Sequence, residues 1–250
     1  PEKEKAFIET GTPILDLLDD FATVWNMRKE YVLKNKTKEV IDNELKIAGR
    51  VLLSNPKSYW GWHHRRWCID LLDDYDCHSE LELSSQFILS DCRNFHAWRH
   101  RRWAAHKCGN VDNEELQNMS KLIEANFSNF SAWHYRSQLL KPDSNFEDEI
   151  AFAQAAFWTD VNDQSSWIYY RWLLNQPVIS QNQELIESEI SGMEELIVVE
   201  PKSKYPLLGL IWLQKKLATP NSNRISEAVN SLCSLDPIRA PYYQELRIQE

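Results

Sequence analysis

The stretch that decides the fold is NPKSYWGWHHRRW, residues 55–67. Related blocks follow at residues 91–101 (DCRNFHAWRHR), 126–136 (NFSNFSAWHYR) and 160–170 (DVNDQSSWIYY), and a looser copy, LDDFATVWNMR, precedes them at 18–28. The tryptophans of the five copies lie 37, 36, 35 and 34 residues apart, at Trp25, Trp62, Trp98, Trp133 and Trp167. A period in this range is typical of arrays of helical hairpins.

Each column of the repeat has a physical interpretation. Seven residues before the tryptophan stands an Asn or Asp, which forms turns. Four residues before it stands a residue that caps helix N-termini, namely Ser58, Asn94, Asn129 and Asp163. A small residue directly before the tryptophan lets a neighbouring helix approach. An arginine three residues after it, on the same helical face, recurs as Arg28, Arg65, Arg101 and Arg136, with Arg171 one position further in the fifth block.

The segments between these blocks have apolar residues at helical spacing, so each repeat is predicted to be a pair of antiparallel helices. Two degenerate blocks, EPKSKYPLLGLIW and LDPIRAPYYQEL, place Tyr205 and either Tyr242 or Tyr243 where the tryptophan stood. We therefore expect one all-α domain over residues 1–250, a right-handed α-α superhelix of about six to seven antiparallel hairpins. Its repeats would be centred near the five tryptophans, Tyr205 and Tyr243.

Composition excludes several classes of protein. The formal net charge of −9 argues against a nucleic-acid binder. No apolar run approaches ~20 residues, so no membrane span is predicted. With no signal peptide at the first residues, a cytoplasmic location is expected. The five cysteines are odd in number and include no CxxC pair, which favours free thiols over a disulfide framework or a zinc ribbon.

Five histidines near the tryptophans are candidate metal ligands: His63, His64, His96, His100 and His134. In equivalent positions of other repeats they are exchanged for tyrosine, arginine or isoleucine, which would not preserve a ligand. Adjacent histidines on a helix also point about 100° apart. We therefore expect no metal bound by this chain, and we expect these histidines to pack and to form hydrogen bonds.

A candidate anion site lies in the second and third repeats. Five residues before the tryptophan stand Lys57 and Arg93, at helix N-termini that favour negative charge. Neighbouring hairpins would present Lys57, Tyr59, Arg93, Asn94 and His96 along one edge. The alternative is that both cations are merely solvated and that Asn94 only caps its helix.

The tryptophan blocks, each followed by its arginine, resemble the α-subunit repeat of protein prenyltransferases over about residues 15–247. Within that family they look most like the α subunits of type II enzymes, the Rab geranylgeranyltransferases. The last two blocks favour that branch. The passage from RWLLNQP to EPKSKYP within about 30 residues leaves no room for the immunoglobulin-like domain of animal forms. The chain therefore resembles the compact form, as in fungi, without that domain or leucine-rich repeats.

The resemblance implies a transferase that is active only as an obligate heterodimer with a β subunit. That partner would hold the zinc, so no cofactor is expected on this chain. Geranylgeranyl diphosphate would lie at the subunit interface, and its lipid would pass to C-terminal cysteines of Rab GTPases presented by a Rab escort protein. By the same resemblance Lys57 would stabilise charge on the departing diphosphate, with Tyr59, Asn94 and His96 lining the same region.

Two alternatives stay open. The chain resembles, less closely, the α subunit shared by farnesyltransferase and type I geranylgeranyltransferase, which needs no escort protein. It is also compatible with a non-catalytic helical-repeat scaffold that binds proteins. The confinement of basic residues to two adjacent repeats favours an enzyme, because a scaffold does not need it.

Overall fold

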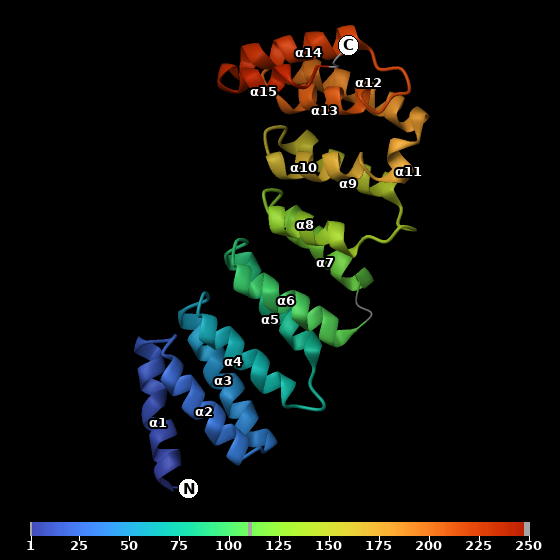
Figure 1. The fold of residues 1–250 in the computed structure, drawn as a ribbon. Coiled ribbons are helices and arrows are strands. Elements are labelled where there is room, and N and C mark those ends of the chain that lie inside the picture. Colours follow the sequence, from blue (N-terminus) through green and yellow to red (C-terminus); the bar gives the residue numbers. More distant parts are fainter. Residues whose placement is uncertain (1, 110–111, 248–250) are drawn as a thin grey trace. The chain divides into compact units, whose positions relative to one another are not determined.

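A computed structural model describes residues 2–109 and 112–247 of the chain. Within these ranges all regular secondary structure is helical (Figure 1), which confirms the predicted all-α class. The chain forms two compact units, Pro1–Glu114 and Glu115–Glu250. None of the described helices has both the length and the apolar character needed to cross a bilayer.

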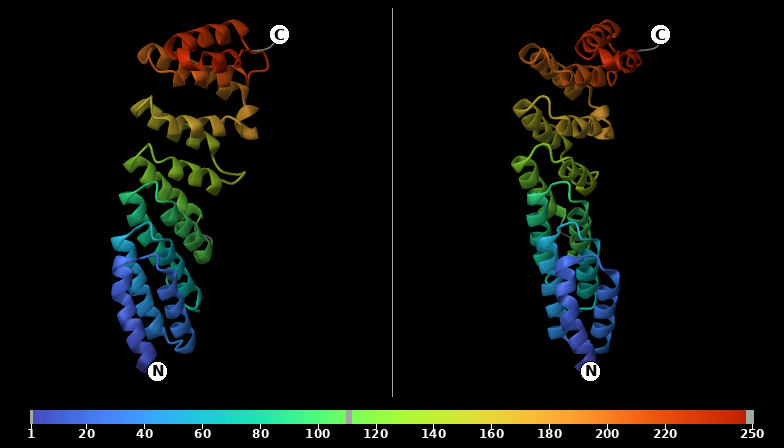
Figure 2. Two further views of the ribbon diagram at one scale, coloured as in Figure 1. Left: turned by 60° about the vertical axis from the view of Figure 1, so that its left-hand side comes forward. Right: turned by 90° about the vertical axis from the view of Figure 1, so that its left-hand side faces the viewer.

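The first unit consists of three successive helix pairs, which follow one another along the chain (Figures 1 and 2). Its helices are α1 (Glu2–Leu17), α2 (Ala22–Lys34), α3 (Lys38–Ser54), α4 (Tyr59–Asp70), α5 (Cys77–Ser90) and α6 (Phe95–Cys108). Helix α1 packs on α2, α3 on α4, and α5 on α6. The second helix of each pair also contacts the second helix of the following pair: α2 contacts α4, and α4 contacts α6. These second helices carry the tryptophan blocks.

The second unit repeats this arrangement. Its helices are α7 (Asp112–Ala125, which begins before the unit boundary), α8 (Phe130–Leu139), α9 (Phe146–Thr159), α10 (Gln164–Leu173), α11 (Pro177–Ser180), α12 (Gln183–Val199), α13 (Tyr205–Gln214), α14 (Ser222–Leu235), a 3-10 turn η1 (Pro237–Arg239) and α15 (Ala240–Gln244). The pairs α9–α10, α12–α13 and α14–α15 pack together, and α10 contacts both α8 and α13.

The predicted turns and caps are confirmed in detail. The turn residues Asn55, Asp91, Asn126 and Asp160 each accept the backbone N–H two residues on. The four predicted cap side chains accept backbone N–H groups in the first helical turn. At Gly61 an added Cβ would lie 3.1 Å from Leu52 of α3, so the small-residue column does permit close helix approach.

The tryptophan column is the core of each hairpin. All five column tryptophans are at most 5% exposed. Each donates its indole N–H to the carbonyl six residues earlier, at 2.7–2.9 Å: Trp25 to Asp19, Trp62 to Pro56, Trp98 to Cys92, Trp133 to Phe127 and Trp167 to Val161. Each tryptophan therefore fixes the turn that leads into its own helix.

The arginine column is buried and paired with a glutamate that the sequence did not single out. The guanidinium donates to both carboxylate oxygens in three pairs, Arg28–Glu44, Arg65–Glu80 and Arg136–Glu149. Each glutamate lies on the first helix of the following pair. A further donor comes 20 residues after the glutamate: His64 to Glu44, His100 to Glu80 and Tyr169 to Glu149. Each set of arginine, glutamate and histidine or tyrosine forms what we call a clamp, and each clamp connects successive hairpins.

The later blocks depart from the pattern. In α10 the arginine position holds Tyr170, which donates to the buried Glu189 at 2.7 Å, while Arg171 lies exposed over the ring of Trp212. Tyr205 is the first residue of α13 and stacks on Trp167 with ring centres 5.9 Å apart, and the buried Leu207 follows it in the same turn. Tyr243 is buried in α15.

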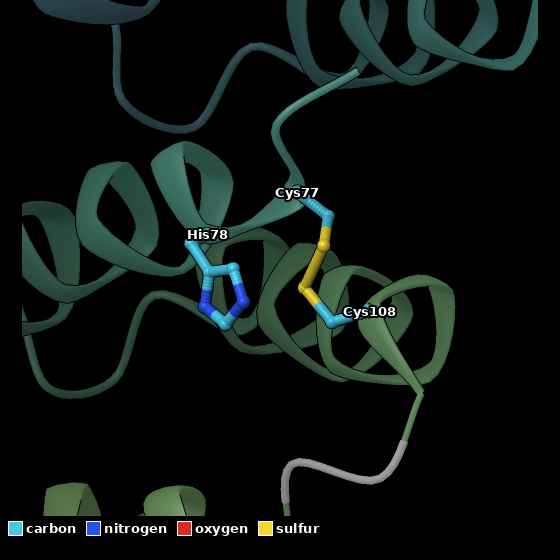
Figure 3. A group of neighbouring side chains, drawn as sticks. All are labelled: Cys77, His78 and Cys108. Carbon is cyan, nitrogen blue, oxygen red and sulfur yellow. A yellow bond between two sulfur atoms is a disulfide. The ribbon is translucent and has the colours of Figure 1, made fainter. Parts of the chain in front are cut away.

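The expectation that all cysteines are free thiols is wrong. Cys77, the first residue of α5, and Cys108, the last of α6, form a disulfide with their Cα atoms 5.5 Å apart (Figure 3). Because α5 and α6 run antiparallel, residues 31 apart in sequence meet at the open end of the hairpin. Cys68, Cys92 and Cys233 take no part in a disulfide.

Candidate functional site

Lys57 and Arg93 lie in equivalent turns and share one carboxylate. The Lys57 ammonium is 3.0 Å from Asp91 Oδ2, and the Arg93 backbone N–H donates to Asp91 Oδ1 at 2.9 Å. The hydrogen bond from Lys57, followed by that from Arg93, lowers the pKa of Asp91. The side chains of Lys57 and Asp91 are 63% and 36% exposed, so an incoming anion can compete with Asp91 for the ammonium.

Asn94 is fully buried and acts within the fold. Its oxygen accepts the backbone N–H groups of His96 and Ala97, and its amide donates to the Pro56 carbonyl at 2.8 Å. Pro56 also accepts the indole N–H of Trp62. Asn94 therefore ties the start of α6 to the turn before α4.

The N-terminus of α4 already has a carboxylate partner. Asp20 accepts the backbone N–H groups of Tyr59 and Trp60 and the hydroxyl of Ser58. The first amides of this helix are therefore occupied. Anion binding here depends on side-chain cations rather than on the helix terminus.

Tyr59 and His96 meet at an open groove between α4 and α6. Their rings are 6.1 Å apart in an edge-on arrangement, and the Tyr59 side chain is half exposed. The groove has a volume of about 420 Å³ including the solvent at its mouth, and its lining residues are Tyr59, Trp62, His63, Arg66, His96, Arg99 and His100. It brings aromatic rings and two guanidinium groups to one place.

The charge of the groove comes from Arg66 and Arg99, because its histidines are held neutral. Burial, and then the charges of Lys29 and other cations, lower the pKa of His63. Burial also lowers the pKa of His96, against the opposing effect of Asp20. The Lys29 ammonium lies 2.9 Å from His63 Nε2 and donates to it. At neutral pH the groove therefore presents fixed guanidinium charges beside neutral imidazoles.

The structure thus divides the predicted site residues into three groups. Tyr59 and His96 line the groove, Lys57 and Arg93 flank Asp91 at the adjoining turns, and Asn94 is buried beneath them. Arg66 and Arg99 also line the groove and were not among the predicted site residues, and His63, a candidate metal ligand in the sequence, lines it as well. The available signals were the arginine pair Arg65–Arg66 after Trp62, of which Arg65 is buried against Glu80, and the arginine directly after Trp98.

Of the five histidines considered as metal ligands, His64 and His100 instead donate to buried glutamates. Within the described ranges, the ligand-type side chains that converge closely are those of Cys77, His78 and Cys108.

Stacked helical hairpins, each with a tryptophan anchor and joined by buried arginine–glutamate pairs, define a helical-repeat protein. The family described as "Protein prenyltransferase alpha subunit repeat" matches residues 41–72, 77–108, 112–141 and 146–177, about half of the chain. The chain belongs to this family, which confirms the resemblance inferred from the repeat blocks.

Relatives extend the match along the chain. "Geranylgeranyl transferase type-2 subunit alpha" of Mus musculus is 39% identical over 196 residues, which cover 70% of this chain and 35% of that protein. The chain thus spans about a third of the length of this relative. The protein of the same name from Dictyostelium discoideum is 31% identical over 246 residues, covering 91% of this chain and 79% of the relative.

A solved structure shares the fold. "Candida albicans protein geranylgeranyltransferase-I complexed with GGPP" aligns with a TM-score of 0.74 at 21% identity, covering 95% of this chain and 82% of that chain. At this identity the likeness supports the fold alone.

Proposed function

We propose that this chain is the α subunit of a type II protein geranylgeranyltransferase, working in the cytoplasm as a heterodimer with a β subunit. The dimer would transfer geranylgeranyl from its diphosphate to C-terminal cysteines of Rab GTPases bound to an escort protein. The β subunit would hold the zinc and most of the lipid pocket. The observation that carries the proposal is the sequence match to type 2 α subunits across nearly the whole chain.

In this proposal the chain's own contribution is electrostatic. Lys57 leaves Asp91 and binds the diphosphate, which costs little because an exposed ion pair is worth only about 0–1 kcal/mol. Arg93 lies in the adjoining turn and Arg66 and Arg99 in the groove, and they add positive charge where negative charge builds on the leaving diphosphate. Tyr59 and His96 supply hydrogen-bonding groups, and Asn94 is a positioning residue that holds the two turns together.

A second candidate is the α subunit shared by farnesyltransferase and type I geranylgeranyltransferase. The chain shares its fold with the Candida albicans type I structure over 95% of its length, and this likeness is compatible with both candidates. The two candidates differ in the β subunit they bind and in the need for an escort protein.

The test is co-expression with each class of β subunit, followed by lipid transfer to a Rab protein with and without its escort. Transfer that requires both the type II β subunit and the escort supports the proposal. Transfer to a CaaX-type peptide with a type I or farnesyl β subunit favours the second candidate. Failure to bind any prenyltransferase β subunit contradicts both and leaves a scaffold.

The role of Lys57 is tested in the active dimer. We expect Lys57→Ala to lower kcat at least about tenfold, by comparison with the roughly 10²–10³-fold loss when one oxyanion donor is removed. Lys46→Ala, at an exposed lysine of α3, is the matched control and should leave kcat unchanged. Equal rates for both variants would contradict the role.

A further inference from the structure

We propose that Cys77, Cys108 and His78 form a Zn²⁺ site when the two cysteines are reduced. The site lies at the open end of the α5–α6 hairpin, where the helices begin and end. It revises the prediction that this chain binds no metal. It does not depend on the proposed transferase function.

The three side chains have the donor types and proximity that zinc requires. The two sulfur atoms and a ring nitrogen of His78 all lie within 4.8 Å of one another. Zinc takes thiolates at about 2.3 Å and imidazoles at about 2.0–2.1 Å, so tetrahedral ligand atoms lie roughly 3.5–3.8 Å apart. Once the sulfur–sulfur bond is broken, small rotations of the side chains bring the three atoms to that spacing.

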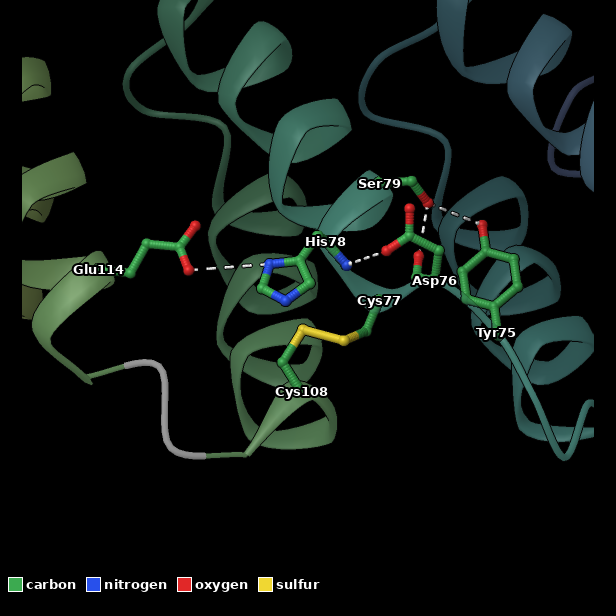
Figure 4. Close-up of a disulfide and its surroundings, with 7 residues drawn as sticks. All are labelled: Tyr75, Asp76, Cys77, His78, Ser79, Cys108 and Glu114. Carbon is green, nitrogen blue, oxygen red and sulfur yellow. Dashed lines mark hydrogen bonds and ion pairs between the residues drawn. A yellow bond between two sulfur atoms is a disulfide. The ribbon is translucent and has the colours of Figure 1, made fainter.

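His78 is oriented for this role. Its Nδ1 faces the Glu114 carboxylate at 3.8 Å, and its other ring nitrogen is turned toward the sulfur atoms (Figures 3 and 4). A metal-bound histidine commonly donates its second N–H to a carboxylate, which fixes the ring and strengthens the ligand. Although neighbours on a helix point about 100° apart, the imidazole reaches back over the first turn to the Cys77 sulfur.

The surroundings also suit a cation held by thiolates. Cys77 is the first residue of α5, where the helix dipole favours an anionic sulfur. Asp76 caps this helix by accepting the His78 backbone N–H at 3.0 Å, which fixes the backbone that carries both Cys77 and His78. Two thiolates and an imidazole leave a fourth position for water, because the His78 side chain is about half exposed.

The disulfide and the metal exclude each other. Two equivalents of a low-molecular-weight thiol reduce the bond: the sulfur–sulfur bond breaks, both cysteines become thiols, and the reductant is oxidised to its own disulfide. Zinc then binds as the two thiols release two protons. In a reducing compartment disulfides are rare, so there the metal would take over the joining of α5 to α6.

The test is metal titration of the full chain, in the form in which it purifies, after reduction with a phosphine and its removal. Co²⁺ is the probe, because thiolate ligation produces charge-transfer bands and a tetrahedral site produces intense d–d bands. We expect one equivalent of Co²⁺ to bind, Zn²⁺ to displace it, and the disulfide form to show no thiolate bands. Cys77→Ser and Cys108→Ser should lose those bands.

Matched variants separate the site from chance thiol binding. Cys233→Ser removes an equally half-buried thiol and His134→Gln an exposed histidine, and both should bind Co²⁺ as the unchanged chain does. Glu114→Gln should weaken binding about 10–100-fold, and His78→Gln at least as much. The proposal is overturned if the reduced chain shows no thiolate bands, or if Cys77→Ser or His78→Gln binds as tightly as the controls.

Discussion

The buried clamp at Glu80 makes a quantitative prediction about stability. Glu80 is fully buried and accepts hydrogen bonds from Arg65, His100 and Tyr75 at 2.5–2.7 Å. In Glu80→Gln the side chain keeps its shape but loses its charge and one acceptor oxygen. Arg65 is then left buried with an amide group that offers N–H where the guanidinium needs an acceptor.

Two routes give the size of the effect. Removing one partner of a buried ion pair costs about 3–5 kcal/mol. Burial alone would raise the pKa of Glu80, but hydrogen bonds from His100 and Arg65 and the charge of Arg65 outweigh it and hold the pKa at about 2. Against the usual value of 4.5, that difference corresponds to roughly 3 kcal/mol. The two estimates agree.

The assay is urea unfolding of the full chain followed by tryptophan fluorescence, with hydrogen exchange to locate the loss in α5 and α6. Glu82→Gln, on the exposed face of the same helix, is the control and should change the unfolding free energy by less than about 0.5 kcal/mol. A loss below about 1 kcal/mol for Glu80→Gln would refute the reasoning that the charged clamp stabilises the hairpin.

The chain contains a natural comparison at Glu189. There the donors are the neutral Tyr170 and Gln154. The effect of burial is larger than that of these hydrogen bonds and raises the pKa of Glu189. The ionised carboxylate therefore lowers the stability of the folded chain at neutral pH. Glu189→Gln should therefore be far milder than Glu80→Gln, within about 1 kcal/mol of the unchanged chain.

Three further predictions follow from particular contacts. Because the folded pKa of Glu80 is depressed, its contribution is complete above pH 4.5 and is lost as the pH falls toward about 2, so Glu80→Gln should flatten acid unfolding in this window. Trp133→Ala should cost about 3–5 kcal/mol by thermal or urea unfolding and Trp158→Ala, at a 45% exposed ring, less than about 1 kcal/mol. In the absence of metal, reducing the Cys77–Cys108 disulfide should lower the unfolding free energy by about 3–4 kcal/mol, as loop closure predicts, with Cys108→Ser insensitive to reductant.

The local part of the fold was predictable because its determinants are close in sequence. The cap at Asn94 and the anchor at Trp98 lie four residues apart, and each acts within one turn. The glutamate partners were not predictable in this way. Glu80 lies 15 residues after Arg65, on another helix, and an exposed and a buried glutamate look alike in one sequence.

The same limit applies to the candidate site and to the cysteines. Tyr59 and His96 were predicted on one edge because the repeat aligns them, and the groove does bring them together. Arg66 was not predicted because the repeat pattern points to its neighbour Arg65. Arg65 is buried in the core, whereas Arg66 lines the groove. The pairing of Cys77 with Cys108 is not predictable from the sequence, because only the antiparallel packing of α5 and α6 makes them neighbours.

The exchange of histidine for tyrosine two residues after the tryptophan now has a physical explanation. His64, His100 and Tyr169 each lie against the tryptophan of the preceding repeat, with ring centres 4.7–4.9 Å apart and planes inclined by 42–46°. Each directs one donor at the glutamate 20 residues earlier. Burial lowers the pKa of His100, so its neutral ring donates one N–H, as a tyrosine hydroxyl does.

Histidine and tyrosine should therefore be interchangeable, while a ring without a donor should not. We expect His100→Tyr to change the unfolding free energy by less than about 1.5 kcal/mol, since shape and donor are both kept. His100→Phe keeps a ring but leaves Glu80 short of one hydrogen bond to a charged acceptor, which costs about 1.5–3 kcal/mol. Urea unfolding of the two variants side by side measures the difference. If phenylalanine is tolerated as well as tyrosine, the column selects for ring packing alone and the donor has no part in holding the repeats together.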